Sequence, residues 1–218
     1  MSFRQRIERA VGALKVFPLP SAVLFPGTPL PLHIFEPRYR ALVGDCLASD
    51  RVMALGDLAP GWQADYQGRP PMRPIACAGI VVWHEEVEEG RYNILLQGVT
   101  RVRVLEELPA AHLYREVRAE IIPEMPYRGP LDELLRRALL EVAARLPGHV
   151  GQELLQLASR AEGGALADAV AAALLPDVEG RHAALREVNP EARLALVLDG
   201  VEELIARVGA VAPRGPVN

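Results

Sequence analysis

The chain has 218 residues, of which 50% are hydrophobic and 24% charged, with a formal net charge of -4. This composition is typical of a globular protein with a real core, built as one large domain or two small ones. No run of about 18 consecutive apolar residues is present, so no membrane-spanning helix is expected, and the acidic balance argues against broad binding to nucleic-acid backbone.

The first expected element is a short amphipathic helix over residues 3–14. Its apolar side chains fall on one face, and Arg4, Arg6 and Arg9 lie on the opposite face. Such a helix either packs on its own domain or contacts a membrane or a partner protein. We expect it to pack on its own domain.

A proline-rich stretch follows, FPLPSAVLFPGTPLPLHIFEPRYRALV at residues 17–43, with six prolines and three phenylalanines. It is too apolar for a disordered linker. Proline cannot donate to a β-ladder, so strands here are predicted to lie at sheet edges. Pro37 suits the first turn of a helix that ends near Ala48. The expected strands are residues 16–17, 22–25 and 30–35.

From residue 51 to residue 122 the apolar pattern has a period of two, which is typical of β-strands. A loop rich in proline and glycine surrounds Trp62, an acidic turn at residues 84–90 predicts a hairpin, and Gly98 predicts a β-bulge. Strands without helices between them predict a small β-barrel or folded sheet. The expected strands are residues 52–55, 76–83, 92–96, 102–104 and 114–121.

After residue 130 the pattern becomes helical and predicts a bundle with short loops. The fold class is therefore α+β, with a β-rich subdomain over residues 1–127 and a helical subdomain over residues 128–218. The expected helices are residues 131–146, 151–161, 164–175, 177–188 and 190–208.

The sequence shows no catalytic constellation. Lys15, the sole lysine, is followed by valine and not by the serine or threonine of a phosphate-binding loop. No serine lies in a G-x-S-x-G elbow. The five histidines stand apart, without zinc-ligand spacing, and His33 is expected in the core. We predict no catalytic residue, no cofactor and no metal.

Cysteine usage and the N-terminus bear on the cellular setting. Cys46 and Cys77 form no close pair, so neither a disulfide framework nor a redox motif is expected. Residues 1–20 are basic without a clean apolar run, unlike a signal peptide. A reducing, cytoplasmic location fits both observations.

Several motifs together resemble a known family. The stretch FPLPSAVLFPGTPLPLHIFEPRYR closely resembles the opening of the N-terminal, substrate-binding domain of Lon proteases. The likeness covers roughly residues 13–208. The chain is similar above all to stand-alone Lon substrate-binding domain proteins of bacteria. Further matching motifs, in chain order, are CAGIVV at 77–82, GRYNILLQGVTRVRV at 90–104, YREVRAEII at 114–122, ALADAVAAALL and RHAALREVNPEARLALVLDGVEELI.

The resemblance implies a PUA-like twisted β-barrel followed by a helical bundle. Full Lon proteases continue into an ATPase module and a Ser-Lys peptidase module. This sequence has no phosphate-binding loop and no second lysine, so we expect no protease and no other enzyme. The resemblance implies binding of unfolded or specific protein partners in protein quality control, with self-association left open and no membrane contact.

Contact with unfolded proteins requires an exposed apolar surface or a strand edge that accepts a peptide. The core is the competing location for each apolar candidate, and the two arginines are expected to pair with acidic side chains of the fold. The candidate contact residues are Leu24, Phe25, Pro26, Leu30, Leu32, Arg38, Arg40 and Trp62.

Two alternatives remain open at this point. The first is a nucleic-acid-binding protein that would use arginines on the predicted strands, namely Arg101, Arg103, Arg115 and Arg118. The acidic total and the lack of an aromatic stacking platform weigh against it. The second is an unrecognised enzyme with a pocket between the two subdomains. A likeness of fold does not decide between them.

Overall fold

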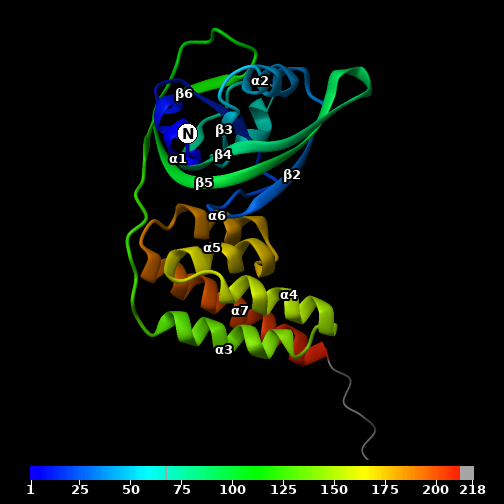
Figure 1. Cartoon of the computed structure of the whole chain (residues 1–218), viewed down its shortest axis with the longest axis vertical. Coiled ribbons are helices and arrows are strands. Elements are labelled where there is room, and N and C mark those ends of the chain that lie inside the picture. The colour runs from blue at the N-terminus through cyan, green and yellow to red at the C-terminus, as the bar shows by residue number, and fades with distance from the viewer. Residues whose placement is uncertain (67, 212–218) are drawn as a thin grey trace, which may run out of the picture.

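The computed structural model, which describes residues 1–66 and 68–211, has an α+β fold (Figure 1). A β-rich half and a helical half lie one above the other, and the segment between β6 and α3 joins them along one side. The strands are β1 (Leu14–Pro18), β2 (Pro29–Ile34), β3 (Val52–Leu58), β4 (Met72–Val87), β5 (Arg91–Glu107) and β6 (Arg115–Ile121). The helices are α1 (Phe3–Ala10), α2 (Pro37–Leu47), α3 (Leu131–Ala143), α4 (Gly148–Ser159), α5 (Gly163–Leu174), α6 (Val178–Arg186) and α7 (Pro190–Val211).

The strands form a closed barrel with one strand added outside it. Their order is β2-β5-β4-β3-β1-β6, and a further pairing of β5 with β6 closes the ring. The long β5 pairs with β6 through its second part and with β2 through its first part. β2 therefore extends the sheet past the barrel. We call this extension, residues 29–35 and 81–97, the wing.

The barrel interior is small and apolar. Ile7 of α1 is completely buried with this cluster, so the amphipathic helix packs on its own domain as expected. Alanines at several inward positions let the strands approach closely around the axis. The buried interior residues are Leu14, Val16, Val52, Ala54, Ala76, Ala78, Ile80, Val102, Val117 and Ala119.

A second, larger core spans both halves of the molecule. It joins Phe17, Leu24 and Phe25 of the β-rich half to Leu135 and Leu166 of the helical half in one continuous cluster. The boundary expected at residue 127 lies between β6 and α3. It stays a prediction, and the shared core indicates that both halves fold as one unit.

The proline-rich opening forms β1, β2 and α2, with Pro37 in the first turn of α2. The strand expected at residues 22–25 is wrong, because these residues are irregular. Thr28 Oγ1 donates to the Phe25 carbonyl at 2.9 Å, and the Gly27 N–H donates to the Gly98 carbonyl at 3.0 Å. This Pro-Gly turn takes the backbone groups that a strand would have used.

The prolines of β2 lie on its unpaired side. The Gly98 N–H donates to the Thr28 carbonyl at 2.9 Å, and hydrogen bonding alternates along an antiparallel pair. Leu30, Leu32 and Ile34 therefore bond to β5, while residues 29, 31 and 33 turn their backbone toward the free edge. Because positions 29 and 31 are prolines without an N–H, this edge has few donors for an added strand.

The expected hairpin and bulge are both present, with shifted limits. β4 continues through residues 84–87, which had been expected to turn, and the chain reverses only at residues 88–90. Glu89 and Gly90 have positive φ angles of 64° and 66° there. Next to Gly98, the register skips Val99, which is the extra residue of a bulge. The five expected helices are α3 to α7, although α4 begins at Gly148.

Buried ion pairs fix the helical half against the barrel. Arg101 of β5 donates to Asp168 of α5 through Nη1 at 2.8 Å and Nη2 at 2.7 Å, and through Nε to the Leu185 carbonyl at 2.9 Å. Arg193 of α7 lies 3.2 Å from the same carboxylate and is also paired with Glu124. Arg101 is buried, so it is unavailable as a nucleic-acid contact.

Candidate functional site

The outward face of the wing carries a row of apolar side chains that is exposed at both ends and half-buried at Leu95 in the middle. Trp83 of β4 pairs with Leu95 of β5, which pairs with Pro31 of β2, so their side chains lie on one face of the sheet. Trp83 is 50% exposed, and Phe35, just after β2, is 61% exposed and stacked on His33 at 6.2 Å. We call Pro31, His33, Phe35, Trp83 and Leu95 the wing face.

A polar row runs beside the apolar one. His33 Nδ1 donates to Asn93 Oδ1 at 2.8 Å, and Asn93 Nδ2 donates to Glu85 Oε2 at 3.3 Å. The Glu85 carboxylate is therefore held two residues from Trp83 on the same face of β4. His33 is exposed and not in the core, because it belongs to the outward set of β2.

The opposite face of the wing is part of the core. Ile34 and Ile94 are buried there, and they share a cluster with residues of α2. Arg40 of α2 also donates to the Glu89 carbonyl at the end of the hairpin. Figure 1 shows α2 on the side of the barrel away from the helical half. The wing face is thus presented by a supported sheet and not by a free loop.

A groove of about 640 Å³ lies between the two halves, next to the wing. Its wall includes the turn before β2 and exposed small side chains of α5. Pro29 lines the groove and lies on the same side of β2 as Pro31, so the groove adjoins the wing face. The other lining residues are Pro26, Gly27, Thr28, Glu153, Gln156, Leu157, Arg160, Ala161, Ala165, Ala169, Ala172 and Ala173.

The groove has little that would support catalysis. Glu153 and Arg160 are its charged lining residues, and the lining holds no described histidine, cysteine or serine. Among the described residues, no three metal-binding side chains come together. Burial raises the pKa of the Cys46 and Cys77 thiols to about 12, so neither is a nucleophile near neutral pH.

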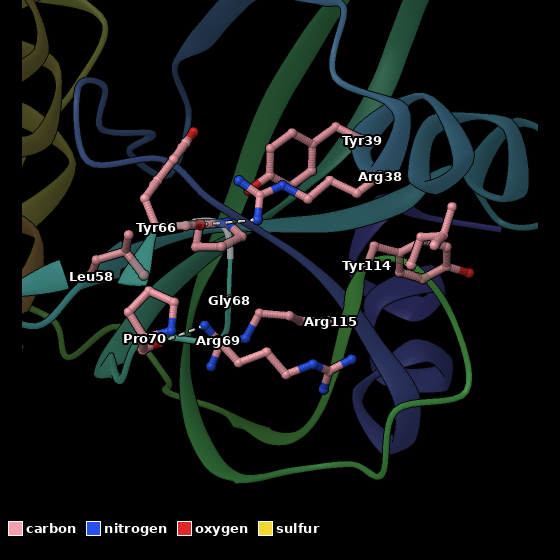
Figure 2. Close-up of a pocket in the computed structure, with 11 residues that line it drawn as sticks. Arg38, Tyr39, Leu58, Tyr66, Gly68, Arg69, Pro70, Tyr114 and Arg115 are labelled. Atoms are coloured by element: carbon pink, nitrogen blue, oxygen red, sulfur yellow. Dashed lines mark hydrogen bonds between the residues drawn. The ribbon is translucent and has the colours of Figure 1, made fainter. Parts of the chain in front are cut away.

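A second pocket, of about 240 Å³, is lined by arginines and tyrosines (Figure 2). The Arg38 guanidinium lies over the rings of Tyr39 and Tyr66, at 4.6 Å and 4.9 Å from their centroids. It donates to Glu36 Oε2 and to the Tyr66 carbonyl, both at 3.1 Å. Burial raises the pKa of Tyr39 and keeps it neutral.

The other arginines of this pocket are also paired. Arg115 binds the Glu107 carboxylate and donates to the Pro70 carbonyl at 2.7 Å, the contact drawn in Figure 2. Arg69 donates to the same Glu107 at 2.8 Å. These cations therefore hold the loop after β3 against α2 and β6, and they do not form an open anion site.

Comparison with known proteins now decides the family. The model of the ATP-dependent protease La (LON) substrate-binding domain matches residues 13–203. This chain belongs to the Lon substrate-binding domain family. Lon protease 4 of Sorangium cellulosum is 30% identical over 201 residues, which are 90% of this chain and 24% of that protein. Lon protease 2 of Myxococcus xanthus is 28% identical over 194 residues, 85% of this chain and 23% of that protein.

Solved structures show the same fold. The N-terminal domain of Mycobacterium avium complex Lon protease gives a TM-score of 0.70 at 16% identity, over 88% of this chain and 98% of that one. A Lon N-terminal domain protein from Xanthomonas campestris gives 0.64 at 22% identity, over 86% and 97%. The chain spans about a quarter of the curated Lon relatives it matches. None of the described helices is long and apolar enough to cross a membrane.

The predicted contact residues of this Lon-family domain do not form one surface. Leu24 and Phe25 are 0% exposed, so their prediction as contact residues is wrong. Leu30 and Leu32 are half-buried on the inward side of β2, and Pro26 lines the groove. The alternation of β2 placed the leucines inside and the prolines, His33 and Phe35 outside.

The remaining candidates have partners within the fold. Arg38 pairs with Glu36 as expected, whereas Arg40 bonds to a backbone carbonyl and not to an acidic side chain. Trp62 is half-buried and meets Tyr66 edge-on at 5.4 Å. Sequence reasoning missed Trp83 and Phe35. The signal that could have found Phe35 is the alternation of residues 30–35, whereas the register shift between Val81 and Trp83 hides Trp83 from simple alternation.

The arginines considered for nucleic-acid binding do not form a free basic face in this Lon-family fold. Arg103 pairs with Glu120 at 3.0 Å, and Arg118 pairs with Glu106 at 3.0 Å. Arg115 is buried against Glu107. Each cation is balanced by a neighbouring carboxylate, so this alternative loses its structural support.

Proposed function

We propose that this Lon-family domain is a non-catalytic module that binds polypeptide chains through the wing face. Its partners would be unfolded or specific proteins in protein quality control. The observation that carries the proposal is the wing face itself, where Trp83 and Phe35 are half exposed or more on a supported sheet. Exposed aromatic side chains that gather on one face are typical of interaction sites.

Recognition through side chains is favoured over strand addition. The free edge of β2 lacks the N–H groups of Pro29 and Pro31, so a peptide could not complete a regular ladder there. The rings of Trp83 and Phe35 offer apolar area with little rotamer entropy to lose on binding. The adjoining groove lets an extended chain continue past Pro31 toward Pro29.

The test is a fluorescence-anisotropy titration with a labelled, permanently unfolded model protein. Trp83→Ala and Phe35→Ala should each weaken binding by roughly tenfold, as expected for anchoring aromatic residues. Trp62→Ala is the matched control, because this tryptophan lies in the loop after β3 and should leave the affinity unchanged.

The folded form of the same model protein and a single-stranded RNA serve as further probes. Saturable binding of the unfolded chain alone supports the proposal. Equal binding of all three probes, or wild-type affinity in both aromatic variants, would refute binding through the wing face. A loss of affinity in Trp62→Ala instead would indicate that the contact surface is the loop after β3.

A further inference from the structure

We propose that the wing face selects polypeptide segments that present a basic side chain, arginine or lysine, within an apolar stretch. The cation would lie over Trp83 and pair with Glu85, while the flanking apolar residues contact Leu95, Pro31 and Phe35. This inference rests on the proposed function and names the class of segment that the same surface takes.

The position of Glu85 is the first reason. A carboxylate on a hairpin usually moves freely in solvent, but Asn93 donates to Glu85 Oε2, and His33 in turn holds the Asn93 side chain. The hydrogen bond uses one carboxylate oxygen and leaves the other for a ligand. Because all three residues lie in one cross-strand row, the charge stays on the same side of the sheet as the wing face and beside it.

The neighbouring ring is the second reason. Trp83 and Glu85 are alternate residues of one strand, so their side chains leave the same face about 7 Å apart. An arginine or lysine can lay its aliphatic stem across the indole and still reach the carboxylate. Indole faces attract cations, and half of the Trp83 surface is exposed to receive one.

The charge around the wing face is the third reason. Glu85, Glu86, Glu88 and Glu89 lie together on the hairpin. The nearby cations that bond to it are Arg91 and Arg40, which contact the carbonyls of Glu88 and Glu89. Four acidic and two basic groups leave a local excess of negative charge, which attracts cationic segments and repels acidic ones.

The hairpin provides its own matched control. Glu86 carries the same charge one residue away, but it belongs to the row of Tyr92 and Ile34 on the opposite face. Both glutamates are exposed, so neither Glu85→Gln nor Glu86→Gln should disturb folding. The two variants change net charge equally and differ in which face loses it.

The experiment uses the full chain and three labelled peptides of leucine and phenylalanine that differ at one central residue, arginine, glutamine or glutamate. We expect the arginine peptide to bind about fivefold tighter than the glutamine peptide and the glutamate peptide to bind most weakly. Glu85→Gln should remove the preference for arginine, and Glu86→Gln should keep it.

The outcomes separate this inference from the proposed function. Equal affinities for all three peptides, with binding lost in Trp83→Ala, would overturn the inference and leave the wing face as a general apolar site. If Glu85→Gln and Glu86→Gln reduce the preference for the arginine peptide equally, the direct contact with Glu85 is overturned. The preference would then come from the general negative charge of the hairpin. No binding of any peptide or of the unfolded protein would overturn both.

Discussion

Gly98 is the residue that lets the turn before β2 lie against β5. A Cβ atom built on Gly98 would lie 2.0 Å from the Phe25 carbonyl oxygen and 3.2 Å from Leu24 Cγ. The obstacle is backbone, which cannot rotate away as a side chain can. This contact explains why Leu24 and Phe25 are core residues, and it fixes the point where β2 begins.

Gly98→Ala should therefore destabilise the protein by about 2–4 kcal/mol, because the added methyl group forces the backbone apart. Gly44→Ala is the control. Nothing lies within 4 Å of a Cβ at Gly44, and alanine in a helix is favoured over glycine by about 0.5–1 kcal/mol. Urea unfolding measures both. Equal midpoints for the two variants would contradict the backbone contact.

At the scale of elements, β2 combines an apolar inward side with an edge that resists pairing. A strand that extends a sheet past a barrel would ordinarily expose a full row of donors and acceptors. Pro29 and Pro31 remove two of those donors. They leave the bonds to β5 intact, because the backbone at these two positions points toward the free edge and not toward β5. The prolines thus keep the wing open to side-chain contacts while limiting association of its edge.

Pro31→Val should restore an N–H at this edge and promote concentration-dependent self-association. The measurement is analytical ultracentrifugation over a range of protein concentrations. Pro60→Val, at an exposed loop position away from the sheet edge, is the control and should sediment as the wild type does. A Pro31→Val protein that matches the control at every concentration would contradict the role given to the edge.

The sequence predicted most elements because the periodicity of their apolar residues is clear. It failed where contacts between residues far apart in the chain determine the local structure. Residues 22–25 look like a strand, but Phe25 bonds to Thr28 within a turn, and Gly27 of that turn bonds to Gly98. Residues 84–87 look like an acidic turn, yet pairing with β5 keeps them extended. That second error hid Trp83 and Glu85 as parts of one sheet face. The buried pairing of Arg101 with Asp168 joins residues far apart and leaves no local signal.

At the scale of the whole molecule, two buried aspartates and the arginines paired with them hold the halves together. Besides the Arg101–Asp168 pair, Asp57 of β3 lies 3.0 Å from Arg73 of β4 and 3.0 Å from Arg186 of α6. Removing one partner of the Arg101–Asp168 pair should cost about 3–5 kcal/mol, because the other charge stays buried.

His182 of α6 makes the set of charges around Asp57 sensitive to pH. The ring is buried with its Nε2 3.4 Å from Asp57 Oδ1, and Arg186 and Glu179 of its own helix also face it. Burial lowers the pKa of His182 below its ordinary value, and the attraction of Asp57 offsets only part of that effect. The unfolded chain therefore takes up a proton at a higher pH than the folded protein does.

Because the unfolded state binds the extra proton, the free energy of unfolding should fall as pH drops below about 6.5, by up to about 1.4 kcal/mol per pH unit from this residue. The contribution should be constant above about pH 7.5, where the ring is neutral in both states.

Urea unfolding from pH 8 to pH 5 measures the slope of the free energy of unfolding against pH. His182→Gln should reduce it, and His149→Gln, at an exposed position of α4, should not. A slope that is unchanged in His182→Gln would contradict the role given to this ring.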